Sequence, residues 1–200
     1  FSSAPAGATF IVHNGVYLSD RNETLMWIKR GGTADNPRRF VGESRDRVVI
    51  GGRATVEADH VELTTMTFDL ERYTVDPDRS FGTITVVDAR DVTVKNVTCT
   101  GDRATGCRGG HIELGYLGQD KIASHVVVQE CLLENYGRHG KPEGKRDHGI
   151  YISAGRNVLI RNNEIRYNAG RGIQIYAHGG GADRIRNVKI LGNRIHHNGG

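Results

Sequence analysis

The chain has 200 residues, which is enough to bury a substantial core in a single domain. Only 6% of the residues are aromatic and 27 are glycine, a composition that favours short strands joined by tight turns over a helical bundle. The formal net charge is +4, yet the sequence holds no basic run and no aromatic platform. A nucleic-acid partner is therefore disfavoured, whereas a solvated surface and a basic groove for an acidic glycan both fit the composition.

The N-terminal quarter of the chain predicts short strands separated by polar turns. Asn14–Gly15 is a turn signal, and the Gly, Asn and Pro content of residues 31–37 predicts a loop. Lead-in strands are expected at residues 10–18, 25–30, 39–41 and 47–50. Helical periodicity and inter-domain linkers are both absent from the sequence. We therefore expect one domain over residues 1–200, in which lead-in strands and first turns (1–52) precede regular turns (53–200).

From residue 54 onward a short strand pattern recurs, most clearly between Asp147 and Gly170. Residues 149–153 and 157–160 each alternate apolar and polar residues, which is typical of a strand with one buried face. A polar Asn162–Asn163 corner and an apolar Ile165 follow. The first strands of the copies align at Ile84, Ile112, Ile150 and Ile173, and the second strands at Val61, Val92, Val126, Val158 and Val188.

The spacing of these copies indicates how the strands stack. The shortest interval between equivalent residues, from Ile150 to Ile173, sets a minimal repeat of 23 residues. Longer intervals contain extra residues at only two places, after the first strand of a copy and before the next one. Insertions confined to particular corners are typical of a β-solenoid, because each turn buries its apolar column by stacking on its neighbours. The pattern predicts an all-β, single-stranded solenoid; one turn of it is called a rung below.

The run GIYIS…NVLIRNNEIRYNAGRGIQI, with Asn163 and Asn193 at one inside corner, resembles the right-handed parallel β-helix repeats of pectate-lyase-like proteins. The resemblance covers about Val48 to Gly200 and implies a right-handed parallel β-helix in which the corner asparagines stack into a ladder. The family includes polysaccharide lyases, glycoside hydrolases, uronan epimerases and non-enzymatic adhesins. The resemblance therefore specifies the fold and leaves the activity open.

The ends of the chain suggest a piece of a longer protein. The first residues resemble a strand that in this family usually follows a capping helix, and His196 to Gly200 stop where the next first strand should begin. The sequence has no apolar run of 18 residues and no signal peptide, so no membrane span is expected. The family resemblance implies a secreted or cell-surface location.

The three cysteines lack the spacing of metal ligands. Cys99 falls in an apolar column and is expected to be a buried free thiol, Cys131 falls at the ladder corner, and Cys107 lies in an insertion. They leave the redox compartment open.

Side chains that point outward from the first strands are candidates for substrate binding. Alternation along each strand predicts an outward row of Thr85, Glu113, Tyr151 and Gln174. Four insertions flank this row and could wall it into a groove: 101–109, 116–124, 136–147 and 177–186. Aromatic faces and hydrogen-bonding groups suit a sugar polymer. The predicted substrate-binding residues are Glu113, Tyr151, Gln174, Tyr176 and His178, and Tyr136 is a further aromatic candidate.

The 136–148 insertion concentrates titratable groups directly before the central strand. Removal of the proton beside a uronate carboxylate needs a base and a cation that holds the developing charge. His148 or a lysine could act as the base, and Arg146 or Arg171 could bind the carboxylate, although a solvated loop would carry the same residue types. The predicted catalytic residues are Asp147, His148, Lys145, Arg146 and Arg171.

The function predicted from these residues is binding and cleavage of an acidic polysaccharide by β-elimination. A glycoside hydrolase would instead use two carboxylates, for which Glu113 and Asp147 are the candidates. Calcium is compatible with the family, but no evident acidic cluster surrounds the row, so no metal or other cofactor is predicted. A structural or adhesive β-helix is the non-enzymatic alternative. The substrate and the oligomeric state stay open.

Overall fold

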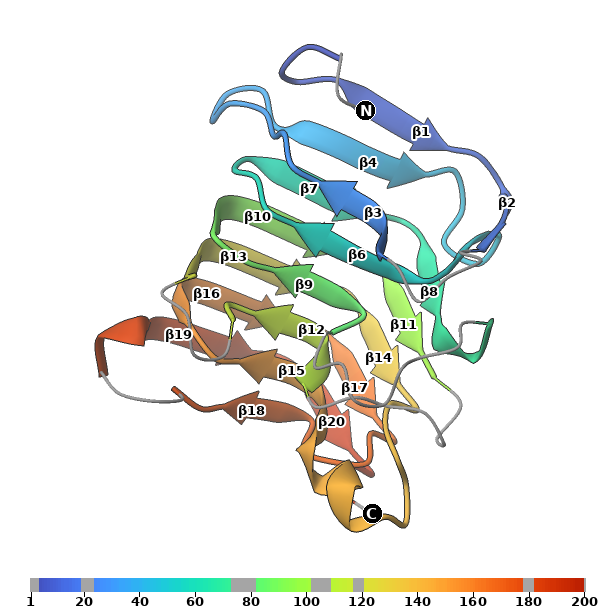
Figure 1. Cartoon of the computed structure of the whole chain (residues 1–200), viewed down its shortest axis with the longest axis vertical. Helices are drawn as coiled ribbons and strands as arrows, with labels where there is room; N and C mark the ends of the chain where they lie inside the picture. Colours follow the sequence, from blue (N-terminus) through green and yellow to red (C-terminus); the bar gives the residue numbers. More distant parts are fainter. Residues whose placement is uncertain are drawn as a thin grey trace.

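The computed structural model describes residues 4–18, 24–72, 82–101, 109–116, 121–177 and 182–199. Within these residues the chain winds as a right-handed parallel β-helix, and each complete rung contributes one strand to each of three parallel sheets (Figure 1). The rungs stack in chain order from the N-terminus to the C-terminus, which lie at opposite ends of the solenoid. The all-β fold class predicted from the sequence is therefore confirmed.

The first strands of the repeat, which contain Ile84, Ile112, Ile150 and Ile173, belong to sheet C, and this sheet carries the candidate site. Sheet C contains β3 (Thr24–Ile28), β6 (Arg53–Val56), β9 (Ile84–Val86), β12 (Gly109–Leu114), β15 (Asp147–Ile152) and β18 (Ile173–Ile175). Sheet A contains β1 (Thr9–Val12), β4 (Arg38–Gly42), β7 (Val61–Thr64), β10 (Ala89–Lys95), β13 (Ala123–Gln129), β16 (Gly155–Arg161) and β19 (Ile185–Leu191). Sheet B contains β2 (Gly15–Leu18), β5 (Val48–Gly51), β8 (Thr67–Asp69), β11 (Thr98–Thr100), β14 (Leu132–Glu134), β17 (Glu164–Arg166) and β20 (Arg194–His196). Short 3₁₀ turns occur at η1 (Leu70–Arg72), η2 (Pro142–Arg146) and η3 (Ala182–Arg184).

Stacked aliphatic columns hold the rungs together. Ile112 pairs in register with Ile84 on one side and with Ile150 on the other, and Ile150 pairs with Ile173. On sheet A, Val92 pairs with both Val61 and Val126. Most of these side chains are fully buried, and each contributes roughly 1.5–3 kcal/mol relative to an exposed position. The columns predicted from the repeat are confirmed.

Each rung has three strands, although the repeat pattern indicated only two. The third strand lies in sheet B and is three residues long in most rungs, as in β11 and β14. A strand of three residues places only one side chain, such as Cys99 or Leu133, in the core. Such a strand has no alternation that can be recognised in a sequence. The sequence marked it only as an apolar position after the polar corner.

The strands predicted over residues 10–18 and 25–30 form the first complete rung, β1 to β3, and those predicted over 39–41 and 47–50 are β4 and β5 of the next rung. Strands β1 and β2 belong to different sheets and pair in parallel with β4 and β5, so the Asn14–Gly15 turn is a corner and not a hairpin. The backbone N–H of Asn14 donates to the carboxylate of Glu43 at 2.9 Å, which ties this corner to the next rung. The loop predicted over residues 31–37 is confirmed by the absence of regular structure there.

Two asparagine ladders line the inside corners. Asn163 lies between rungs: its Oδ1 accepts from Cys131 N at 2.9 Å, and its Nδ2 donates to Asn193 Oδ1 at 2.9 Å. This ladder confirms the expectation for Asn163 and Asn193. Asn168 and Asn198 form a second ladder at the corner between sheets B and C, where Asn168 Nδ2 donates to Asn198 Oδ1 at 2.9 Å. Both ladders satisfy backbone groups that the tight corners would otherwise leave buried and unpaired.

Cys99 is a buried free thiol, as expected. Cys131 is a buried free thiol at the ladder corner, where its backbone N–H donates to Asn163 Oδ1, and Cys107 lies outside the described residues. None of the helical turns in the described part of the chain has the length and apolar character needed to cross a membrane.

Candidate functional site

The outward row on sheet C has the arrangement that the sequence predicts. Glu113 on β12 pairs in register with Thr85 on β9 and with Tyr151 on β15, and Tyr151 pairs with Gln174 on β18. Successive members therefore lie one strand spacing apart, about 4.8 Å. The four strands that carry the row are neighbours in the lower half of the solenoid (Figure 1).

A glycine brings His148 onto the same face as Tyr151. A Cβ added to Gly149 would overlap Ile165 Cγ2 and lie 3.1 Å from Asn168 Nδ2, so Gly149 faces the core beside Ile150. Strict alternation is broken there, and the His148 ring instead stacks on the Tyr151 ring with centroids 5.7 Å apart and planes inclined at 27°. No larger residue would fit at position 149 without displacing the core.

His148 is held neutral by its surroundings. The side chain is buried, and its Nδ1 accepts a hydrogen bond from the backbone N–H of Arg171 at 3.0 Å. Burial and the nearby Arg171 cation lower the pKa of His148 from 6.5 to about 4, against the opposing effect of Asp147. At neutral pH the ring therefore carries no charge.

Glu113 and Tyr151 are also uncharged at neutral pH. Glu113 is buried, and its Oε2 accepts from Gly82 N at 3.1 Å, while Oε1 has no hydrogen-bond partner within the described ranges. Burial raises the pKa of Glu113 to about 8, although the Gly82 hydrogen bond and Arg53 oppose the rise. Burial, together with Glu113 and Tyr176, raises the pKa of Tyr151 to about 12. The outer face of β12 and β15 thus holds three titratable side chains in their neutral forms.

Asp147 faces Arg138 and not the row. Its carboxylate is fully buried, and Arg138 donates to it three times: from the backbone N at 2.9 Å, from Nε at 2.8 Å and from the guanidinium Nη2 at 2.8 Å. This bidentate pair ties the loop before β15 to the first residue of the strand. In this position the carboxylate anchors the loop and is closed off from a ligand on the outer face.

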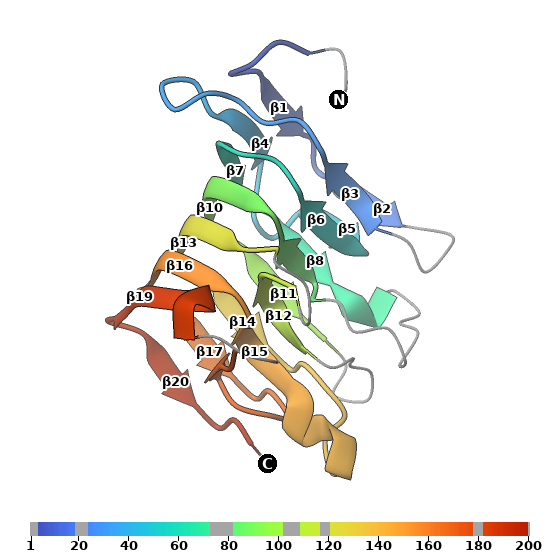
Figure 2. The same ribbon diagram turned by 60° about the vertical axis from the view of Figure 1, so that its left-hand side comes forward.

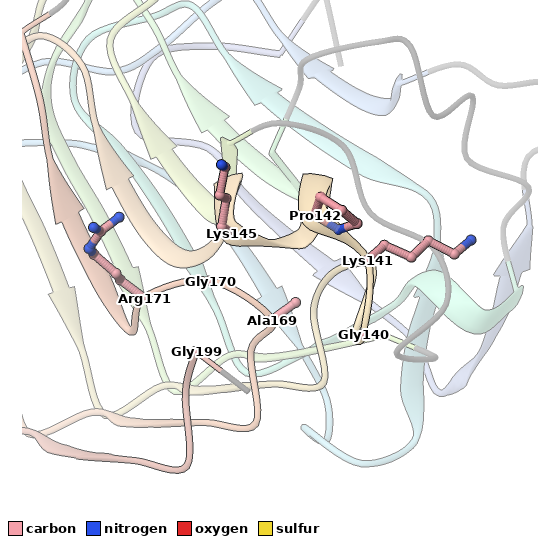
Figure 3. A pocket seen from close by; sticks show the side chains of 8 residues that line it. All are labelled: Gly140, Lys141, Pro142, Lys145, Ala169, Gly170, Arg171 and Gly199. Atoms are coloured by element: carbon pink, nitrogen blue, oxygen red, sulfur yellow. The ribbon is translucent and has the colours of Figure 1, made fainter.

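A basic hollow adjoins His148 at the corner between sheets B and C. Its volume is about 560 Å³, and its lining residues are Gly140, Lys141, Pro142, Lys145, Ala169, Gly170, Arg171 and Gly199 (Figure 3). The side chains of Lys141, Lys145 and Arg171 are exposed, and none of them forms an ion pair within the described residues. In Figure 3, Lys145 and Arg171 extend to the same side of the hollow, and Lys141 extends away from it.

The hollow lies at the C-terminal end of the solenoid, where the η2 loop projects from the stacked rungs (Figure 2). Gly170 connects the hollow to His148, because a Cβ added there would lie only 2.6 Å from His148 Nδ1. The two candidate features, the neutral row and the basic hollow, are therefore contiguous.

The remaining predicted residues have varied surroundings. Gln174 is half-buried and Tyr176 is exposed, both beside Tyr151, while Arg146 is exposed at the end of η2 but does not line the hollow. His178 lies outside the described residues, as do most of the insertions at 101–109 and parts of those at 116–124 and 177–186. Tyr136, expected in the groove, is instead fully buried.

The burial of Tyr136 follows from a contact that the sequence did not indicate. Its ring packs against His111 with centroids 4.6 Å apart. His111 is itself fully buried between Thr83 Oγ1 at 3.0 Å and Glu134 O at 2.8 Å, and burial lowers its pKa to about 4. His111 pairs with no charged group in these contacts, so it fills the corner of the core as a neutral side chain.

In the part of the chain that the structure describes, no three His, Cys, Asp or Glu side chains lie close enough together to bind one metal ion. The buried Glu113, Asp147 and His148 side chains each have a different partner: Gly82 N, Arg138 and Arg171 N, respectively.

Comparison with known proteins identifies the fold. No curated protein sequence matches the chain. The PL6-family polysaccharide lyase Pedsa3628 from Pseudopedobacter saltans is similar in structure with a TM-score of 0.50 and 10% identity, over 96% of this chain and 48% of that one. The PL6-family alginate lyase AlyGC has a TM-score of 0.47 and 13% identity, over 87% of this chain and 28% of that one. At such identities the likeness concerns the fold alone.

A pectin methylesterase in complex with a hexasaccharide has a TM-score of 0.43 and 18% identity, over 91% of this chain and 61% of that one. The chain thus spans 28% and 48% of the two lyases. The sequence model of the right-handed beta helix region matches residues 70–200, which is more than half of the chain. The chain belongs to the family of right-handed β-helix proteins.

Proposed function

We propose that the chain is part of a carbohydrate-active protein that binds an acidic polysaccharide on the outer face of sheet C and cleaves it by β-elimination. The observation that carries the proposal is the basic hollow, where Lys145 and Arg171 extend to the same side and have no ion-pair partner among the described residues (Figure 3). Cations gathered without counter-charges at one site favour an anionic ligand. The contiguous row of neutral tyrosine, glutamic acid and amide side chains suits the hydroxyl groups and apolar faces of sugars.

The chemistry of β-elimination assigns distinct tasks to these residues. A base removes the proton on the carbon beside the uronate carboxylate, and the electron pair forms the new carbon–carbon double bond as the bond to the glycosidic oxygen breaks. That oxygen leaves with a proton from an acid. We assign Arg171 to the carboxylate, where it would hold the developing charge, and Lys145 to the base, which acts once its ammonium group has given a proton to the solvent.

Tyr151 fits the role of the acid. Its raised pKa of about 12 keeps the phenol protonated, so that it can give a proton to a leaving alkoxide. Gln174 and Tyr176 would hold neighbouring sugars, with His178 in the adjoining insertion, and the buried Glu113 would position Tyr151 beside them. Arg146, which does not line the hollow, would add to the local positive potential. An extracellular location, either secreted or at the cell surface, accords with such a substrate.

One observation favours elimination over hydrolysis. The Asp147 carboxylate that a hydrolase would need is fully buried in its pair with Arg138. The fold likeness to a polysaccharide lyase agrees with this preference.

The proposal is tested with the protein and a panel of uronate-containing polysaccharides, by following the ultraviolet absorbance of unsaturated products. Arg171→Gln and Lys145→Gln should each lower the rate at least about tenfold, because a charge-assisted contact is worth roughly 1.5–3 kcal/mol. Lys189→Gln is the matched control, since Lys189 is exposed on β19 of sheet A. New reducing ends without absorbance would indicate a hydrolase, and the absence of both on every glycan would leave a binding or structural β-helix.

A further inference from the structure

The protonation state of His148 can be assigned from its contacts. The donor to Nδ1 is a backbone N–H, that of Arg171 at 3.0 Å, and a backbone amide cannot accept a hydrogen bond. Nδ1 must therefore be the unprotonated nitrogen. The proton of the neutral ring is then on Nε2, the nitrogen on the other side of the imidazole.

Packing prevents the ring from leaving this orientation. Gly170 lies so close that an added Cβ would be 2.6 Å from Nδ1 and 3.0 Å from Cε1. On another side the ring stacks on Tyr151. A half-turn about the Cβ–Cγ bond would place Cδ2 where Nδ1 now lies and would leave the Arg171 N–H without this acceptor.

These contacts conflict with the use of His148 as a base. Nε2 already carries a proton, and Nδ1 is occupied by the amide, so neither nitrogen can take the proton of a substrate. We propose that His148 acts instead as an uncharged hydrogen-bond donor through Nε2–H, and that Arg171 N–H and Gly170 fix it in this tautomer. The glycan-facing part of this inference depends on the proposed function, whereas the tautomer does not.

The groups that face the ring favour the same state. Arg171 disfavours a second positive charge, and Tyr151 is a neutral phenol. The Asp147 carboxylate favours protonation, but it is already engaged by Arg138. Lys145, across the adjoining hollow, adds further positive potential. Among the described residues no unpaired carboxylate therefore faces the ring to stabilise an imidazolium.

The acceptor for Nε2–H would be an oxygen of the bound sugar acid. A neutral donor in the neighbourhood of Arg171 can share the carboxylate of a uronate, whose second oxygen needs a partner once the first one pairs with the guanidinium. During elimination negative charge builds up on this carboxylate, so a fixed donor stabilises the transition state more than the ground state. His148 is thereby assigned to recognition and charge stabilisation, and proton removal falls to another group.

Nitrogen NMR of the histidine side chains tests the tautomer without any substrate, because the two ring nitrogens have different shifts in the Nε2–H, Nδ1–H and imidazolium forms. The His148 signal is identified by its loss in His148→Gln. We expect the neutral Nε2–H form from pH 5 to 8. An Nδ1–H form or an imidazolium at pH 7 would overturn the inference.

Two substitutions test the role in binding. Gln extends an amide donor to about the reach of Nε2, whereas Asn is one methylene shorter and places its amide near Nδ1. His148→Gln should keep the affinity for an acidic oligosaccharide within about threefold, and His148→Asn should lower it about 10- to 100-fold. Equal losses in both variants would overturn the donor role. If the unmodified protein binds no acidic glycan, the proposed function and the glycan-facing role fail together, and the NMR result alone decides the tautomer.

Discussion

Replacing Asn163 by alanine should destabilise the solenoid strongly, because this side chain connects three rungs. Its Oδ1 accepts from Cys131 N, and its Nδ2 donates to Val128 O at 3.0 Å and to Asn193 Oδ1. The truncation leaves the Cys131 N–H and the Val128 carbonyl without this partner in a site where Asn163 is only 2% exposed. At about 1–3 kcal/mol for each buried group, we expect a loss of about 2–6 kcal/mol in the free energy of unfolding. That is a large share of the roughly 5–15 kcal/mol that stabilises a typical domain.

Urea unfolding followed by circular dichroism measures this loss, provided that the dependence on denaturant is unchanged. Asn162→Gly is the matched control: Asn162 is the neighbouring residue, is exposed, and has a φ of 55°, a conformation that glycine adopts readily. The control should change the stability by less than about 1 kcal/mol. If Asn163→Ala shifts the midpoint no more than the control does, the ladder does not hold the rungs and the reasoning is wrong.

Three further predictions concern the buried ionisable groups. Arg138→Met leaves the buried Asp147 carboxylate unpaired and should cost about 3–5 kcal/mol in urea unfolding, of which a second change, Asp147→Asn, should restore a part; no recovery would contradict the pair's role. With its pKa raised to about 8, folded Glu113 keeps a proton that the unfolded chain releases above pH 4.5, so the free energy of unfolding falls as the pH rises from 4.5 to 8. Glu113→Gln should remove this dependence, whose slope is up to about 1.4 kcal/mol per pH unit. Parallel curves of unfolding free energy against pH for the two proteins would refute this. With its pKa lowered to about 4, folded His148 does not bind the proton that the unfolded chain binds below pH 6.5, so the free energy of unfolding falls as the pH drops from 6.5 to 4. His148→Gln should lessen that fall. Urea unfolding of both proteins at pH 4.5 and 6.5 measures the difference, and an equal fall in both would contradict the prediction.

Much of the fold could be predicted because one physical pattern is repeated. The Ile84, Ile112, Ile150 and Ile173 column recurs at corresponding positions of the rungs, and the strands that carry these residues pair in that register. Stacking requires an aliphatic side chain at each of these positions, so the column is visible without a structure. The third strand of each rung escaped prediction because three residues are too few to show alternation.

The site could be predicted only in part, because its geometry depends on irregular backbone. The row through Glu113 and Tyr151 follows from strand alternation, but the Arg138–Asp147 pair forms within a loop of irregular conformation. No spacing rule indicates such a contact. A signal did exist for the orientation of His148. Gly149 and Gly172 precede the equivalent residues Ile150 and Ile173, and both glycines face the core. A Cβ on Gly149 would overlap Ile165, and one on Gly172 would overlap Ile195. A repeated glycine beside a core column indicates a close backbone approach.

The central claim is that the basic hollow and the adjoining row cleave an acidic polysaccharide by elimination. The most direct test is mass spectrometry of the products formed by the protein in water enriched in oxygen-18. Elimination forms an unsaturated sugar at the new non-reducing end without consuming water. The account therefore predicts unsaturated fragments that are one water lighter than hydrolysis products and carry no label when the reaction is stopped before reducing ends exchange with the solvent. Labelled reducing ends, or no fragments from any uronate-containing polysaccharide, would contradict it.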